Sequence, residues 1–223
     1  MNVTVRAMQL GAPEPTRASR ALWNIDWDAF LPRTLTEDGV ALFASSVERI
    51  RSFMSAHYAE IFEDDPERHR FLTEPFDDAK LRYLETADVF EIQYRQRVVG
   101  TLIAGPSDWS TYYLRSMAVL RPYQGRQTHA AIMSFLFEKL RDAGVRRVEA
   151  DTSPANLAVI QVLTRMRFNV TGSFLTERWG AVLRLTKYLE GEAEGTFLNT
   201  FCSGIHYQRR PARDRDPQKG GLS

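Results

Sequence analysis

Residues 117–129 read MAVLRPYQGRQTH, and this stretch decides the fold. An apolar strand end stops at Arg121-Pro122, because proline donates no hydrogen bond to a sheet and keeps its neighbour out of the helical conformation. A helix is predicted from near Gly125 to Gly144, since apolar residues recur there at three- and four-residue steps. The first turn of such a helix has unpaired backbone N–H groups and a partial positive charge, which favours binding of phosphate or pyrophosphate.

A second strand-to-helix junction follows the predicted strand Val145–Thr152. Ser153 and Pro154 are typical of an N-cap and of a first helical residue. Asn156 then begins a helix face that is otherwise apolar, and a polar side chain in that position needs a partner. Two such junctions close together are typical of the ligand-binding edge of an α/β sheet.

The remaining elements are predicted from their periodicity. The apolar residues between Thr36 and Phe62, Phe43 among them, follow the helical repeat, and Thr36 is a suitable cap. Residues 63–85 suggest short helices. Strands are expected at Val89–Tyr94, Val98–Ala104, Thr111–Val119, Phe168–Glu177 and Ala181–Leu189.

The length and composition predict one folded domain. A chain of 223 residues that is 43% hydrophobic can bury a full core. We expect a flexible N-terminal leader over residues 1–20 and the folded domain over residues 21–190. The C-terminal extension, residues 191–223, is expected to be disordered from about residue 208, where arginines dominate and apolar residues are scarce.

The charge, cysteine and histidine content limit the expected binding partners, the cellular location and the metals. A net charge of +1 gives no reason to expect nucleic acid, and no run of about 18 apolar residues predicts a membrane span. The single cysteine, Cys202, and the lack of a secretory pattern at the N-terminus favour a cytoplasmic location. The four histidines show no ligand spacing, so no metal is expected.

The order of these elements resembles the GNAT superfamily of acyl-CoA-dependent N-acyltransferases. The family's turn reads Gln or Arg, two variable residues, Gly, one variable residue, then Gly or Ala, and it cradles the pyrophosphate of coenzyme A. Here the window is Gln124-Gly125-Arg126-Gln127-Thr128-His129, in which Gln127 and His129 replace small residues. The resemblance covers roughly residues 30–190. It implies an α/β (α+β) fold with a mixed, mostly antiparallel central sheet flanked by helices.

The resemblance also implies where acetyl-CoA, or another acyl-CoA, binds as co-substrate. The turn Gln124–His129 would hold the pyrophosphate, and Asn156 would bind the pantetheine arm or a water near the thioester. Backbone N–H groups at the strand end would polarise the thioester carbonyl and pair with the pantetheine amides: Met117, Ala118 and Val119.

Two positions depart from the family pattern near the second helix. Leu163 stands where the family usually has a tyrosine that protonates the leaving thiolate, and leucine cannot donate a proton. We predict that Leu163 belongs to the core. Arg167, directly before Phe168, replaces a usual glycine.

The attacking amine must lose a proton, and several strand residues are candidates for the base. These are Glu91, Tyr112, Tyr113 and, through a water, Asp151. Tyr113 lies at the level where some family members keep a catalytic glutamate, although a phenol with an ordinary pKa of about 10 is a poor base. We predict Tyr113, Asn156 and Glu91 as the catalytic residues.

The function that this sequence favours is acetyl transfer from acetyl-CoA to a primary amine of a small metabolite, by direct attack within a ternary complex. Two other interpretations stay open. A non-catalytic GNAT-like domain could bind acyl-CoA or a protein partner as a regulator, which the loss of two small turn residues and of the thiol acid favours. An enzyme that uses an acyl carrier protein as donor would tolerate an altered pyrophosphate turn. The sequence leaves a homodimer open.

Overall fold

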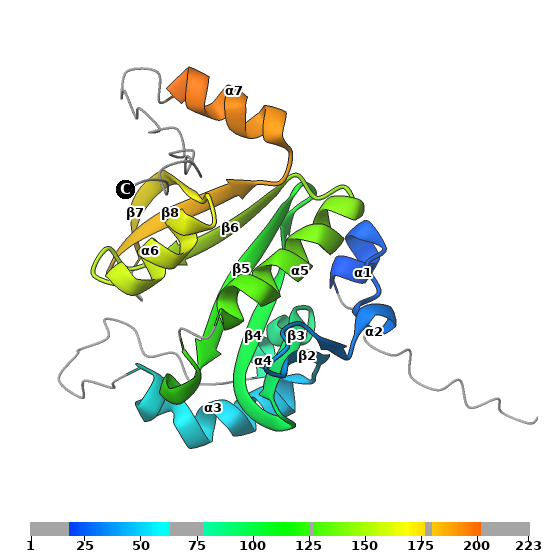
Figure 1. The fold of residues 1–223 in the computed structure, drawn as a ribbon. Helices are drawn as coiled ribbons and strands as arrows, with labels where there is room; N and C mark the ends of the chain where they lie inside the picture. Colours follow the sequence, from blue (N-terminus) through cyan, green and yellow to red (C-terminus); the bar gives the residue numbers. More distant parts are fainter. Residues whose placement is uncertain (1–17, 63–77, 125–126, 177–179, 202–223) are drawn as a thin grey trace, which may run out of the picture.

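An eight-stranded sheet organises the chain, in the order β1-β2-β3-β4-β5-β6-β8-β7 (Figure 1). This computed structural model describes residues 18–62, 78–124, 127–176 and 180–201. All neighbouring strands are antiparallel except β5 and β6, which are parallel, so the predicted mixed, mostly antiparallel sheet is confirmed. The strands are β1 (Arg33–Thr34), β2 (Val40–Ala44), β3 (Asp88–Tyr94), β4 (Arg97–Asp108), β5 (Thr111–Val119), β6 (Arg147–Thr152), β7 (Asn169–Thr176) and β8 (Gly180–Tyr188).

Helices cover both faces of this sheet. Helices α5 and α6 lie on one face, and α3 and α4 lie on the other (Figure 1). Alternation along β3 explains the arrangement, because Phe90 and Ile92 join the core shared with α5, whereas Val89 lines a cavity with residues of α3 and α4. The helices are α1 (Ala18–Trp23), α2 (Trp27–Phe30), α3 (Val47–Phe62), α4 (Asp78–Glu85), α5 (Thr128–Asp142), α6 (Leu157–Arg165) and α7 (Gly191–Phe201).

Helix α5 supplies much of the core on its face of the sheet. Three of its apolar side chains are fully buried at helical spacing: Ile132, Leu136 and Leu140. The helix begins at Thr128 and not near Gly125, because Gln127 has a left-handed backbone (φ 57°, ψ 7°) that a right-handed helix cannot contain. Gly125 itself lies outside the described residues.

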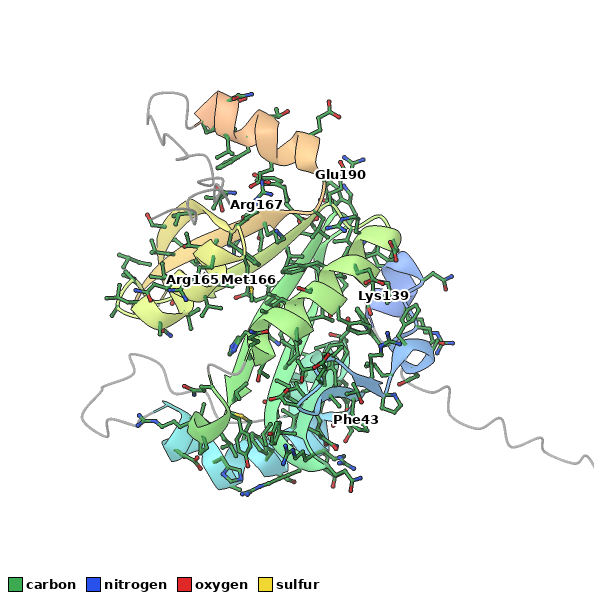
Figure 2. The ribbon with its side chains drawn as sticks, viewed as in Figure 1. Phe43, Lys139, Arg165, Met166, Arg167 and Glu190 are labelled. Atoms are coloured by element: carbon green, nitrogen blue, oxygen red, sulfur yellow. The ribbon has the colours of Figure 1, made fainter. Side chains whose placement is uncertain are left out.

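The single helix predicted between Thr36 and Phe62 is wrong in its first part. That part forms strand β2, which contains Phe43 (Figure 2), and α3 begins only after it. The strand β2 pairs with β3, and its first residues are alternately buried and partly exposed. Its apolar residues therefore follow the two-residue repeat of a strand and not the helical repeat. Thr36 caps no helix, since its hydroxyl oxygen accepts a hydrogen bond from the Val40 N–H in the turn before β2 (2.9 Å).

A buried polar network anchors the N-terminal helices to the sheet. The fully buried Asp88 carboxylate accepts hydrogen bonds from the Ser19 hydroxyl (2.6 Å) and the Tyr112 hydroxyl (2.9 Å). The indole N–H of Trp27 donates to the Ser19 hydroxyl oxygen (3.0 Å). The folded region therefore includes Ser19, so the predicted leader of residues 1–20 overlaps α1; residues 1–17 lie outside the described residues.

Helix α7 begins the predicted C-terminal extension and contacts the domain. Arg167, at the end of α6 (Figure 2), donates to the Glu194 carboxylate at 2.8 Å, and the Glu194 side chain is only 10% exposed. The Phe197 ring packs on Tyr188 of β8, with centroids 5.3 Å apart. Cys202 and the tail predicted to be disordered lie outside the described residues.

Two predictions concern segments that are described only in part. Of the short helices expected over residues 63–85, α4 is found at Asp78–Glu85, and residues 63–77 lie outside the described residues. The strands predicted at Phe168–Glu177 and Ala181–Leu189 are found as β7 and β8, which pair antiparallel, and residues 177–179 between them are not described. Every helix in the described ranges is too short or too polar to cross a bilayer.

Tyr112→Phe is expected to lower the free energy of unfolding by about 1.5–3 kcal/mol, because it removes a hydrogen bond to a buried carboxylate. Urea unfolding of the parent and the variant measures the difference. Tyr83→Phe is the matched control, since Tyr83 is 58% exposed, and its change should stay within about 0.5 kcal/mol. Equal stability of Tyr112→Phe and the parent would show that the Asp88 network does not stabilise the fold.

Candidate active site

The parallel strands β5 and β6 separate partway along their length. They are paired from Thr111 opposite Arg147 to Leu114 opposite Ala150. Beyond Leu114, β5 continues to Val119 with β4 as its strand neighbour, while β6 leads away towards α6. Among the described residues, the last residues of β5 therefore have a backbone edge without a neighbouring strand.

The backbone N–H groups of Met117 and Val119 point to that unpaired edge. The Leu120 N–H donates to the Val99 carbonyl on the β4 side (2.8 Å), and successive residues of a strand direct their hydrogen bonds to opposite sides. The Val119 carbonyl agrees with this alternation, because it accepts a hydrogen bond from the Gln124 side-chain amide (2.7 Å) instead of from β4. Two N–H donors thus face the space between β5 and β6.

Ala118 lies between these donors and faces the opposite way. A Cβ atom added to Gly100 of β4 would come within 2.4 Å of the Ala118 carbonyl oxygen. Strand β4 therefore approaches β5 closely here, and Gly100 permits the approach. Of the three residues predicted to hold pantetheine, Ala118 has its backbone directed to β4.

The start of α5 follows directly after this edge. The Thr128 hydroxyl donates to the Tyr123 carbonyl (3.4 Å) and so ties the turn to the helix. Gln127, the N-cap residue, makes no side-chain capping bond, so a bound anion could pair with the N–H groups of the first turn. Gly125 and Arg126, predicted for the same role, lie outside the described residues.

His129 lies in the first turn of α5, where the family prefers a small residue. Burial lowers the pKa of its imidazole below the ordinary value of 6.5, so the ring is neutral at neutral pH. A neutral ring adds no positive charge to a phosphate site. It can still donate one hydrogen bond.

Gln127 and Arg167 replace glycines of the family pattern, and both keep the left-handed backbone that glycine favours. Their φ angles are 57° and 67°. A non-glycine residue in this conformation costs roughly 1–2 kcal/mol. Both residues therefore keep a backbone that glycine would adopt without strain.

Asn156 caps α6, directly after the end of β6. Its side-chain oxygen accepts a hydrogen bond from the Val159 N–H (3.2 Å). The prediction that Ser153 caps this helix is wrong, because the Ser153 hydroxyl oxygen accepts from the Ala155 N–H in the preceding turn (3.2 Å). The side-chain NH2 of Asn156 takes no part in the cap and remains a donor at the end of the separated strands. Leu163 is 8% exposed and belongs to the core, as predicted.

A charged cluster covers the sheet face opposite α5 and α6. The Tyr113 hydroxyl donates to Asp151 (3.1 Å), and Arg184 of β8 donates to both carboxylate oxygens of Asp151 (2.9 Å each). Burial and the neighbouring Asp151 raise the pKa of Tyr113 to about 12, so the phenol stays protonated at neutral pH. Glu149 joins through an ion pair with Arg184 at 3.4 Å. We call the part of this face over β5, β6 and β8, beside α4, the open face. Tyr112 points away from it into the core.

A bulge in β5 places Arg115 beside this cluster. Leu114 is paired with Ala104 and Ser116 with Ile103, so Arg115 is the extra residue between the two pairs. A bulge of this kind redirects side chains. Arg115 is exposed on the open face, next to α4.

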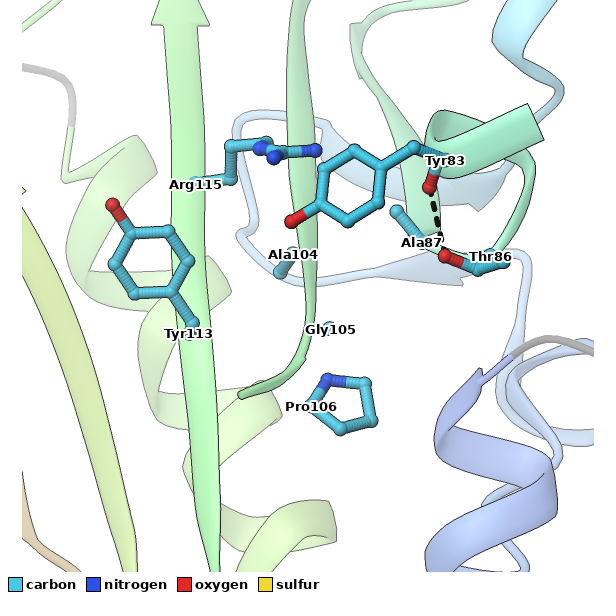
Figure 3. A pocket seen from close by; sticks show the side chains of 8 residues that line it. All are labelled: Tyr83, Thr86, Ala87, Ala104, Gly105, Pro106, Tyr113 and Arg115. Carbon is cyan, nitrogen blue, oxygen red and sulfur yellow. Dashed lines mark hydrogen bonds between the residues drawn. The ribbon is translucent and has the colours of Figure 1, made fainter. Parts of the chain in front are cut away.

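Arg115 and Tyr83 border a small cavity of about 60 Å³ (Figure 3). The guanidinium lies over the Tyr83 ring, 4.2 Å from its centroid, and Tyr113 forms the opposite side (Figure 3). The remaining lining residues are Thr86, Ala87, Ala104, Gly105 and Pro106. The cavity thus joins α4 to the predicted catalytic tyrosine.

Glu91, the other predicted base, is held by three side chains. Burial alone would raise the pKa of this carboxylate, but hydrogen bonds from Arg49, Ser45 and Gln93 lower it below its usual value. The Arg49 guanidinium binds both carboxylate oxygens, with one N···O distance of 2.8 Å. Glu91 is only 4% exposed, and these contacts favour a structural role that fixes α3 to β3.

The described residues contain no group of three or more His, Cys, Asp or Glu side chains arranged to hold a metal ion. The arrangement instead offers backbone N–H donors at a strand edge, a helix start and a carboxylate cluster on the open face. Such a combination suits an acyl transfer with an anionic co-substrate on one side and an amine on the other.

Comparison with known proteins agrees with this arrangement. Residues 48–168, more than half of the chain, match the acetyltransferase (GNAT) family. The chain therefore belongs to this family, which supports acyl-CoA-dependent N-acetyltransferase activity in general. A search of the curated proteins finds no match.

Solved structures share the fold at low identity. The ribosomal-protein-S18-alanine N-acetyltransferase from Escherichia coli has a TM-score of 0.53 at 13% identity, over 68% of this chain and 94% of that chain. The yncA protein from Salmonella typhimurium, solved with its cofactor acetyl-CoA, has a TM-score of 0.51 at 16% identity, over 68% of this chain and 95% of that chain. Naa50 from Arabidopsis thaliana, in complex with the bisubstrate analogue CoA-Ac-MVNAL, has a TM-score of 0.52 at 12% identity, over 66% of this chain and 97% of that chain.

The sequence interpretation missed four residues of the open face: Tyr83, Arg115, Glu149 and Arg184. The sequence gives a signal for Arg184, because this charged residue interrupts the apolar run of β8 and a charge in a strand needs a partner. The sequence gives no signal for Arg115 and Tyr83, since a bulge and the docking of α4 bring them together.

Gln127→Gly is expected to raise the free energy of unfolding by about 1 kcal/mol, because glycine removes the left-handed strain before α5. Gln161→Gly is the matched control: Gln161 is exposed within α6, where glycine should cost about 0.5–1 kcal/mol. Chemical unfolding of the two variants tests the opposite signs. Destabilisation by both would show that Gln127 is not strained.

Proposed function

We propose that this protein transfers an acetyl group from acetyl-CoA to the primary amine of a small molecule. The observation that carries the proposal is the separation of β5 from β6, which leaves the N–H groups of Met117 and Val119 beside the start of α5. The pantetheine arm would lie along these donors and near the Asn156 side chain. The pyrophosphate would lie at the first turn of α5.

In the proposed reaction the amine nitrogen attacks the thioester carbon from the open face. The carbonyl oxygen gains negative charge, which the backbone N–H groups at the β5 edge stabilise. The carbon–sulfur bond then breaks and the amide forms. The leaving thiolate takes a proton from water, because Leu163 supplies none.

Asp151 is our candidate for the proton acceptor, acting through a water. It lies one residue beyond Ala150, the last residue of β6 that pairs with β5, at the level where these two strands separate. Tyr113 and Arg184 hold its carboxylate in place. The high pKa of Tyr113 makes the phenol a donor that orients Asp151, and the contacts of Glu91 favour a structural role for that residue.

Acetyl-CoA is expected to stabilise the full-length protein against thermal unfolding. A ligand at 100 times its dissociation constant adds about 2.7 kcal/mol. Pantetheine at the same concentration should give a smaller shift, because it lacks the pyrophosphate. An equal effect of the two ligands, or no effect of either, would favour an acyl carrier protein as donor or a domain that does not bind acyl-CoA.

Asp151→Asn is expected to lower kcat/KM by about 10²–10⁴-fold in an assay of thiol release with amine acceptors. Asp142→Asn, on the exposed end of α5, is the matched control and should retain parental rates. If the parent binds acetyl-CoA but releases no thiol with any amine acceptor, the protein would be a non-catalytic regulator instead.

A further inference from the structure

Arg115 differs from the other arginines of the open face in its partners. Arg184 and Arg147 each form ion pairs with carboxylates of neighbouring strands or turns. Among the described residues, no carboxylate lies within ion-pair distance of Arg115, whose guanidinium contacts the Tyr83 ring instead. This leaves a positive charge at the rim of the cavity.

The contact with Tyr83 leaves the hydrogen-bonding edge of the guanidinium available. The group lies over the ring at 4.2 Å from the centroid, and its N–H groups point outwards in the guanidinium plane. Two parallel N–H groups match the two oxygens of a carboxylate. Tyr83 is 58% exposed, so this aromatic support lies at the surface where a ligand can reach it.

The position of Arg115 relates this charge to the proposed reaction. Arg115 and Tyr113 are two residues apart on β5, a spacing of about 6–7 Å along a strand. The Tyr113 hydroxyl contacts Asp151, the proposed proton acceptor. A ligand that reaches both places would carry an anionic group at one end and an amine a few bonds away.

The size of the cavity limits that ligand. Its volume is about 60 Å³, and small or apolar residues form much of its wall, including Ala87, Ala104 and Gly105. A carboxylate with a short carbon chain suits such a space, whereas a second charged group would find no carboxylate or amine in this wall.

We propose that Arg115, supported by Tyr83, binds the carboxylate of an amino-acid acceptor and so presents its amino group towards Asp151. This assignment rests on the proposed function and names its acceptor class as small amino acids. Arg115 is thus a specificity-determining residue, and it takes no part in the chemistry.

A binding measurement tests the inference without turnover. The melting temperature of the full chain with saturating coenzyme A is measured with glycine, alanine and β-alanine, and with the amide of each. At least one amino acid should raise the melting temperature of the parent, its amide should not, and the shift should vanish in Arg115→Gln. Arg97→Gln, exposed in the β3–β4 hairpin, should behave as the parent. No shift with any amino acid would overturn the inference.

A kinetic measurement then separates recognition from chemistry. With the best amino acid, Arg115→Gln should raise KM by roughly 10- to 100-fold and change kcat much less, because it removes a charge-assisted contact made before and during the reaction. Arg115→Lys keeps the charge without the paired N–H groups and should give an intermediate KM. Tyr83→Leu should raise KM in the same direction.

The two proposals fail in different ways. Thiol release that is equally fast with amino acids and their amides, or only with peptide amino termini, would sink the carboxylate assignment and leave the acetyltransferase standing. Carboxylate-dependent binding that is lost in Arg115→Gln, without thiol release, would support the ligand site and contradict catalysis.

Discussion

The break in hydrogen bonding between β5 and β6 is the constraint on which the candidate site depends. The two strands are the parallel pair of a sheet that is otherwise antiparallel, and each leads into a helix on the same face. Pairing stops at Leu114, so no strand in the described part of the chain binds the N–H groups of Met117 and Val119. The bulge at Arg115 falls just past the last pair and redirects side chains there. The backbone donors and the arrangement of the open-face side chains thus both arise at the place where β5 and β6 separate.

Backbone conformation is preserved where side-chain identity is not. Gln127 and Arg167 take left-handed angles at two positions where the family uses glycine. Each of these residues has a contact at or beside it that helps to hold it, since Thr128 binds the Tyr123 carbonyl and Arg167 itself binds Glu194. The replacement of glycine therefore says less about loss of the co-substrate site than the sequence pattern alone indicates.

Local signals predicted the part of the fold around the two junctions. Pro122 and the helical repeat of α5 act over a few residues, so the sequence alone could reveal them. The segment from Thr36 was misread because its apolar residues fit both periods, and only pairing with β3 decides in favour of a strand. The Asn156 cap is a local contact, with Val159 only three residues away, and Asn is a favoured N-cap residue, so the sequence carried this signal beside that of Ser153. The Arg115–Tyr83 contact instead depends on where α4 docks on the sheet, and such a tertiary contact leaves no periodic trace in the sequence.

The Asp88 network has a consequence for the order of folding. It joins residues far apart in the chain, with Ser19 at a separation of 69 residues and Tyr112 at 24. Contacts of long sequence separation require costly loop closure and form late. During synthesis, α1 and α2 therefore leave the ribosome well before their binding surface on β3 and β5 exists. Until then the indole rings of Trp23 and Trp27 lack the aromatic partners, Phe90 and Tyr112, on which they pack in the folded domain.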